Sequence, residues 1–153
     1  MPSFSVNWNS TNNASATIPM GNLMTTASVQ ASIYEINAGS DATADNAVKY
    51  SISKTTVRGT NNSTYTPNDV NSAQNAVAAS TFDKGWASVL PTVAANSEVL
   101  QWGMHQRGTY RWVAYDYTKM LTAGASAATK GLALMSVVVT TAFNGVFSIE
   151  YQE

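Results

Sequence analysis

The sequence predicts an all-β protein, an antiparallel two-sheet sandwich of the jelly-roll type with eight or nine strands and little helix. Apolar residues alternate with polar ones along most of the chain, and clusters of Gly, Asn, Asp and Ser separate the alternating segments. Helical spacing is missing even from the Ala-rich stretches 70–79 and 118–130. We expect a loop that runs into a strand over the first stretch, and a long loop with one helical turn over the second.

The alternating segments are expected to be half-buried strands with one face toward the core. In chain order their apolar positions are Phe4, Val6 and Trp8; Ala27, Val29, Ala31 and Ile33; Val48, Tyr50 and Ile52; Leu100, Trp102 and Met104; Tyr110, Trp112 and Ala114; and residues 146–151. A continuous apolar run over 132–139 predicts a strand buried on both faces. Asn144-Gly145 follows it, and Asn-Gly is a strong hairpin signal because both residues tolerate positive φ. We therefore expect residues 132–142 to pair with residues 146–151.

One domain is expected, because 153 residues can bury a sufficient core without a second domain. No repeat or linker divides the chain, and residues 24–153 are predicted to form the sandwich. Residues 1–23 lose their periodicity after Trp8 and are rich in Asn, Ser and Thr. This composition is typical of an N-terminal arm that becomes ordered against a partner, with plain disorder as the alternative.

Charge is scarce along the whole chain. Only 11% of the residues are charged, with 8 Lys or Arg against 9 Asp or Glu, whereas an ordinary soluble domain has about 25%. Ala, Thr, Ser and Asn together fill 71 positions (22, 18, 17 and 14). A surface of such residues suits neutral packing against another protein, because few charges have to leave water. A net charge of −1 without a basic cluster argues against direct nucleic-acid binding, which depends on Lys and Arg.

The sequence also bears on the cellular compartment. No cysteine occurs, which excludes a disulfide framework and a cysteine metal site. The N-terminal sequence MPSFSVNWNS lacks the basic and apolar regions of a secretory signal. The longest apolar run, Gly131–Val139, has nine residues, whereas a membrane-spanning helix needs about 20. We expect a protein that is made in a cytoplasm and has no membrane role.

No catalytic or cofactor-binding pattern is visible. His105 is the one histidine, so no pair or triad of histidines can form a metal site or a hydrolytic relay within one chain. The carboxylates are scattered, and the loop over 41–46 lacks the alternate ligands and terminal Glu of an EF-hand calcium site. Motifs for phosphate, dinucleotide, esterase or metalloprotease chemistry do not occur. We expect a protein that is not an enzyme and holds no cofactor or metal.

Aromatic and arginine residues cluster over 102–117, and the cluster has two interpretations. Alternate aromatic residues on two strands fill a sandwich core, which is the interpretation we favour for Trp102 and Trp112. Tyr, Trp and Arg are also enriched in binding hot spots, and Arg can lie over an aromatic face. On that basis the predicted interface residues are Trp8, Arg107, Arg111 and Tyr115.

Four segments carry a resemblance to a known family. They are IYEINAGSDATADNAVKYSISK; TYTPNDVNSAQNA, in which Thr66-Pro67 and Asp69 precede an Ala-rich strand; QWGMHQRGTYRW; and LALMSVVVTTAFNGVFSIEYQE, in which Gly145, Phe147 and Glu150 hold the pattern. Within residues 32–153 these segments resemble the small capsid cement, or decoration, proteins of tailed bacteriophages. The resemblance implies a virion protein on the outer capsid surface. It would bind the major capsid protein as a homo-oligomer, commonly a trimer, and resist internal DNA pressure.

Two alternatives come from other classes of protein. A jelly roll also serves the major coat protein of small icosahedral RNA viruses, although such coats usually carry a basic N-terminal arm, and here the first basic residues are Lys49 and Arg58. A carbohydrate-binding sandwich module or adhesin is the other alternative. It would require an exposed Trp8 or Trp86 in a concave groove, where the ring can stack on a sugar face.

Overall fold

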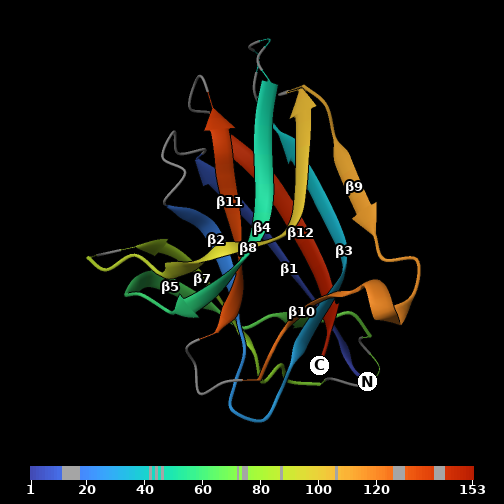
Figure 1. Ribbon diagram of the computed structural model, residues 1–153. Coiled ribbons are helices and arrows are strands. Elements are labelled where there is room, and N and C mark those ends of the chain that lie inside the picture. Colours follow the sequence, from blue (N-terminus) through green and yellow to red (C-terminus); the bar gives the residue numbers. More distant parts are fainter. Residues whose placement is uncertain are drawn as a thin grey trace.

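Two antiparallel β-sheets face each other, as the alternating pattern predicts (Figure 1). The computed structural model describes residues 1–153 except 12–17, 42, 44, 46, 72, 74, 75, 87, 106, 126–129 and 140–143. Sheet A contains β1 (Ser3–Thr11), β3 (Ala31–Ser40), β6 (Asn68–Asp69), β9 (Tyr110–Val113), β10 (Leu121–Ala123) and β12 (Asn144–Gln152). Sheet B contains β2 (Pro19–Met24), β4 (Ala47–Val57), β5 (Asn61–Tyr65), β7 (Thr81–Trp86), β8 (Thr92–His105) and β11 (Gly131–Val139). The described residues add one 3₁₀ turn, η1 (Tyr117–Lys119), which overlaps the start of the stretch 118–130. That stretch was predicted to be a long loop with one turn, but it also contains β10.

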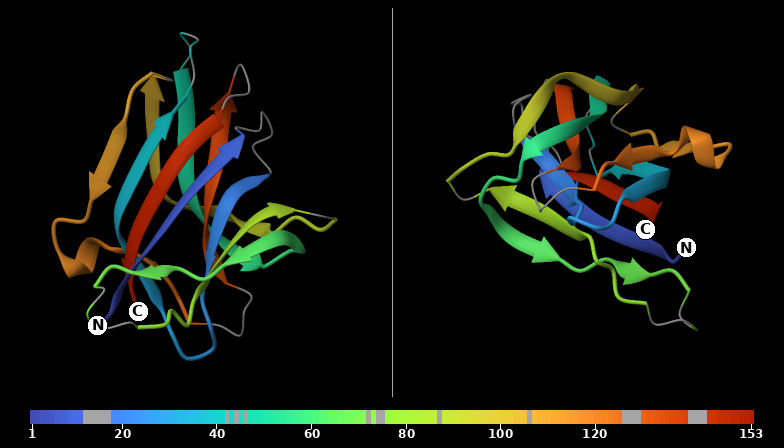
Figure 2. Two further views of the ribbon diagram at one scale, coloured as in Figure 1. Left: turned by 180° about the vertical axis from the view of Figure 1, so that it is seen from behind. Right: turned by 60° about the horizontal axis from the view of Figure 1, so that its bottom comes forward.

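Strands that follow one another in the chain mostly lie in different sheets. Sheet A has the order β10-β3-β12-β1-β6, with β9 also paired to β3, and sheet B has the order β5-β7-β2-β11-β4-β8. The first and last strands, β1 and β12, pair antiparallel along their whole length. Both chain termini therefore lie at the same end of the sandwich (Figures 1 and 2).

The core fills the space between the two sheets. Alternate residues of β1, β3 and β12 point inward from sheet A and meet those of β4, β7, β8 and β11 from sheet B. Toward one end the core is a continuous chain of aromatic rings. The successive centroid distances are 5.3 Å for Trp8–Phe147, 5.4 Å for Phe147–Tyr50, 5.6 Å for Tyr50–Trp102 and 4.7 Å for Trp102–Tyr110. The core interpretation of Trp102 is confirmed, since its side chain is buried, and Trp112 packs half-buried against the same cluster.

The N-terminal segment belongs largely to the sandwich. Residues 1–23 were expected to form an arm, yet β1 lies between β12 and β6, and β2 lies between β7 and β11. Every residue of β2 is buried, so this strand shows no alternation in the sequence. The buried Asn22 amide is satisfied by Thr55 Oγ1 and Met24 Sδ. Residues 12–17, where the arm composition is strongest, lie outside the described residues.

The predicted pairing of residues 132–142 with residues 146–151 is wrong. β11 pairs with β2 and β4 in sheet B, whereas β12 pairs with β1 and β3 in sheet A. Asn144 and Gly145 are the first two residues of β12, so they are not the tip of a hairpin. Because β11 and β12 lie in different sheets, both strands can bury an apolar face in the same core.

A buried ion pair holds one edge of sheet B. Asp83 on β7 is fully buried, and its carboxylate accepts hydrogen bonds from Arg58 Nε at 2.6 Å and Nη2 at 2.8 Å. Thr64 Oγ1 on β5 donates to the same carboxylate at 2.9 Å. The group links β5, β7 and the end of β4, because a buried carboxylate needs several donors to replace its lost hydration.

Candidate functional site

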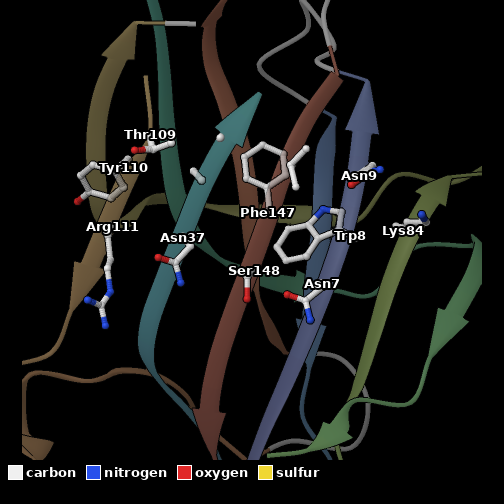
Figure 3. A pocket seen from close by; sticks show the side chains of 13 residues that line it. Asn7, Trp8, Asn9, Asn37, Lys84, Thr109, Tyr110, Arg111, Phe147 and Ser148 are labelled. Carbon is white, nitrogen blue, oxygen red and sulfur yellow. The ribbon is translucent and has the colours of Figure 1, made fainter. Parts of the chain in front are cut away.

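The outer face of sheet A carries a hollow of about 660 Å³, lined by both apolar and polar side chains (Figure 3). The pairing register places Arg111 of β9 beside Asn37 of β3, Asn37 beside Ser148 of β12, and Ser148 beside Asn7 of β1. We call these four side chains the polar row. They cross four strands, about 4.8 Å apart from strand to strand, and Lys84 of β7 stands beyond Asn7 at the far side (Figure 3). The hollow has the size of a small-ligand site, but it lies open on the sheet face.

An ion pair fixes one end of the polar row. Arg111 Nε and Nη2 donate to the two carboxylate oxygens of Glu35 at 2.8 and 3.0 Å, and Asn37 Nδ2 donates to Glu35 at 2.9 Å. Hydrogen bonds from Arg111 and then from Asn37 lower the pKa of the Glu35 carboxyl, and the carboxylate in turn raises the pKa of Arg111. The guanidinium is therefore neutralised by its own chain, and it holds a fixed orientation on the face.

Two carboxylates that are distant in the sequence meet below the polar row. Glu35 lies directly opposite Glu150 in the register of β3 and β12, and like charges in this arrangement repel. Arg111 pairs with Glu35 and so offsets this repulsion, and the Tyr34 hydroxyl donates a hydrogen bond to Glu150 at 2.9 Å. Burial first, and then this hydrogen bond, raises the pKa of Tyr34. A glycosidase acid needs a carboxyl with a raised pKa, whereas the pKa of Glu35 is lowered.

The four predicted interface residues occupy four different places. Trp8 lies in the core with 6% of its surface exposed, packed against Phe82 and Phe147. Among the four residues, Trp8 is the one whose buried side chain a partner could not reach. Arg111 lies in the polar row, with its side chain 66% exposed. Arg107 and Tyr115 lie on loops at other positions, so the four residues do not form a single patch.

Arg107 forms an ion pair and a hydrogen bond close to the end of β8. Its Nε lies 3.1 Å from Asp45 Oδ1 and donates to the Thr43 carbonyl oxygen at 3.1 Å. His105, the last residue of β8, is exposed, with its Nε2 3.8 Å from the same Asp45 carboxylate. Asp41 instead accepts a hydrogen bond from Asn144, so the two aspartates of the 41–46 loop serve different partners.

Tyr115 is strongly exposed together with a residue that the sequence analysis did not single out. Tyr115 is 80% exposed and Tyr117 is 81% exposed, both just after β9. Nothing in the sequence alone separates these two tyrosines from Tyr110, which stacks on Trp102 in the core with an interplanar angle of 8°. The distinction depends on where β9 ends, at Val113.

The described part of the chain gathers no group of three or more His, Cys, Asp or Glu side chains that could hold a metal ion. Among the same residues there is no helix with the length and apolar character of a membrane span. No protein-family model, curated protein or solved structure matches the chain. Its interpretation therefore depends on the surfaces described above.

Proposed function

We propose that the protein is a virion structural protein, a capsid cement protein that binds the outer surface of the major capsid protein and stabilises the shell, as a trimer. The observation that carries the proposal is the neutral character of the sandwich surface. All three arginines of the chain are paired with a carboxylate of the same chain, Arg58 with Asp83, Arg107 with Asp45 and Arg111 with Glu35. Guanidinium groups engaged in this way are not free to neutralise phosphates.

The outer face of sheet A suits contact with another protein. Asn7, Asn9 and Ser148 present amide and hydroxyl groups over a broad, shallow hollow. Such groups can exchange their bonds to water for bonds to a partner, and Arg111 in the same lining is already paired with Glu35. A function that joins protein subunits uses this chemistry directly.

We also propose that the sandwich is of the jelly-roll type. The strand order β1-β12-β3-β9 in sheet A faces the order β2-β11-β4-β8 in sheet B, with the first and last strands adjacent. Two four-stranded sheets connected in this way are the arrangement that viral capsid domains share with lectins and cupins. This strand order favours a second candidate, the major coat protein of a small icosahedral virus. The support is an analogy of fold.

The third class, a carbohydrate-binding module, loses the feature it required. Trp8 is buried, and Trp86 is half-buried with its Nε1 donating to the Pro19 carbonyl oxygen at 2.8 Å. Trp8 lines the hollow on sheet A as a buried side chain, and Trp86 lines a separate hollow of about 300 Å³ as a half-buried one.

Expression of the protein alone tests the proposal, with light scattering and negative-stain electron microscopy as the measurements. Discrete trimers without shells support the cement role, and binding of these trimers to empty capsids that lack them then identifies the partner. Closed icosahedral particles formed by this chain alone support the coat role. A protein that stays monomeric at high concentration and binds no shell contradicts both.

A further inference from the structure

Two exposed tyrosines project from a loop with a fixed conformation. We call residues 114–120 the tyrosine loop. Tyr115 and Tyr117 are 80% and 81% exposed, while Asp116 between them accepts a hydrogen bond from Thr118 N at 2.7 Å and from Lys119 N at 3.1 Å, through its side chain and its carbonyl oxygen respectively. The loop conformation is therefore set before any partner arrives, so binding costs little further ordering of its backbone.

An apolar groove lies on the outer face of sheet B. It has a volume of about 420 Å³, and we call it the sheet B groove. Its lining includes Leu90, Pro91, Val93 and Met135, with Glu98 on the wall. Leu90 is 40% exposed and its neighbour Val89 is 52% exposed. Aliphatic side chains gathered around a hollow in this way are typical of an interaction site.

The tyrosine loop and the sheet B groove lie on opposite sides of the molecule. In Figure 1 the 3₁₀ turn η1 stands at the right edge, whereas the connection between β7 and β8 reaches the left edge. Both views of Figure 2 keep the same separation. A contact between the two features cannot occur within one chain and would join different copies head to tail.

We propose that Tyr115 and Tyr117 of one copy insert into the sheet B groove of the next copy. The inference rests on the proposed function, because it supplies the contact between copies that a trimer or a shell requires. Two aromatic side chains with this exposure would bury on the order of 300 Å², against about 800 Å² per partner in a standard interface. The two tyrosines thus provide more than a third of the required area from one short loop.

Charge complementarity favours a second copy of this chain as the occupant. Lys119 is exposed on the tyrosine loop, and Glu98 is exposed in the sheet B groove. Neither takes part in the ion pairs found among the described residues. When the tyrosines of one copy enter the groove of the next, the ammonium and the carboxylate come to the same interface. A head-to-tail contact of this kind closes into a ring when the rotation between successive copies allows it.

Three variants test the contact by light scattering and sedimentation velocity. The loop variant is Tyr115→Ala with Tyr117→Ala, the groove variant is Leu90→Glu, and the control is Val77→Glu, which places the same charge at a site that is 83% exposed elsewhere. Circular dichroism confirms that each variant folds. We expect at least about 30-fold weaker self-association for the loop and groove variants, because truncated hot-spot residues lose about 2 kcal/mol or more. The control should assemble like the wild type.

Mixing the two defective variants gives the sharpest outcome. The loop variant keeps an intact groove and the groove variant keeps intact tyrosines, so a head-to-tail contact predicts that the mixture forms heterodimers and stops there. If the mixture stays monomeric, or if the loop variant assembles like the wild type, the contact is wrong while the proposed function stands. A wild-type protein that stays monomeric at millimolar concentration contradicts both the contact and the proposed trimer.

A charge exchange provides an independent check on the orientation. Lys119→Glu should weaken association up to about five-fold, since an ion pair at an interface rim contributes up to about 1 kcal/mol. Adding Glu98→Lys to the same chain should restore wild-type association. Failure of the second substitution to restore it contradicts the placement of Lys119 beside Glu98.

Discussion

Tyr50 and Tyr151 offer the same substitution with opposite expected effects. Both side chains are completely buried, and burial raises the pKa of each hydroxyl above its usual value. Tyr151 has a partner, since its hydroxyl lies 2.5 Å from Ser80 Oγ. The Tyr50 hydroxyl has no hydrogen-bond partner in the described part of the chain. Replacement of each tyrosine by phenylalanine removes one oxygen atom and leaves the ring in place.

The size of each effect follows from these contacts. Tyr151→Phe removes a net contribution of about 1 kcal/mol and leaves Ser80 Oγ buried without its partner, which costs about 1–3 kcal/mol when the group cannot find another. We therefore expect Tyr151→Phe to lower the free energy of unfolding by about 2 kcal/mol. Tyr50→Phe removes a hydroxyl that folding buries without a hydrogen bond, so we expect the free energy of unfolding to rise by up to about 1 kcal/mol. The two variants should therefore differ by about 2–3 kcal/mol.

Urea unfolding followed by circular dichroism measures the difference. In a chain of this length 1 kcal/mol corresponds to a shift in Tm of about 2–4 °C, so thermal melts give a second readout. The contrast requires both variants to show the same dependence on urea concentration as the wild type, which indicates an unchanged unfolded state. If Tyr50→Phe destabilises the protein as much as Tyr151→Phe, the Tyr50 hydroxyl has a partner and the reasoning is wrong.

Three further predictions concern charged and titrating groups. Arg58→Met should lose about 3–5 kcal/mol because it leaves the buried Asp83 carboxylate without its main donor, and adding Asp83→Leu should recover part of the loss in urea unfolding. The pKa of Glu35 is lower in the folded chain than in the unfolded one, so the ionised carboxylate stabilises the fold above the unfolded pKa of about 4.3. This stabilisation is lost as the pH falls through the pKa of the folded state. Glu35→Gln should therefore lower the free energy of unfolding by up to about 1 kcal/mol at pH 7, and by less as the pH falls below the unfolded pKa. The raised pKa values of Tyr50 and Tyr151 favour the neutral hydroxyl in the fold, so stability should decline once the pH exceeds the unfolded value of about 10. A free energy of unfolding that stays constant above that pH contradicts this expectation.

The alternation of apolar residues predicted the strands that have one buried face. β12 is the clearest case, since Phe147, Ile149 and Tyr151 are buried and the residues between them are not. The same reasoning failed for β2, because both of its faces are covered and the polar Asn22 occupies a fully buried position. A period of two reports a difference between two faces of a strand, and no such difference exists in β2.

The error at Asn144-Gly145 has a specific physical origin. Asn-Gly signals a residue pair that accepts positive φ, but it does not say whether the following strand folds back beside the preceding one. Here the apolar faces of β11 and β12 point toward each other across the core, from opposite sheets. The turn signal and the apolar pattern are both local, whereas the choice of sheet is decided by partners such as β1, which lies more than 130 residues away from β12 in the chain.

The candidate site could not be assembled from the sequence because the register creates it. Asn7, Asn37, Arg111 and Ser148 come from four separate segments and become neighbours only when four strands pair with their observed offsets. A shift of one residue in any strand would turn its member of the row into the core. The sequence did single out Arg111, because arginine among aromatic residues is unusual in so weakly charged a chain.

The structure shows that the three arginines of this weakly charged chain are all paired with carboxylates. Arg58, Arg107 and Arg111 each contact a carboxylate that is at least 25 positions away in the chain. Counting 8 cations against 9 anions shows near balance, but it cannot show that the guanidinium charges cancel locally. Because they do, a partner that covers a face of the sandwich has to desolvate few arginine charges outside these pairs. Any salt dependence of its binding should therefore come from exposed groups such as Lys119 and Glu98, since screening acts on charges that are exposed and outside ion pairs.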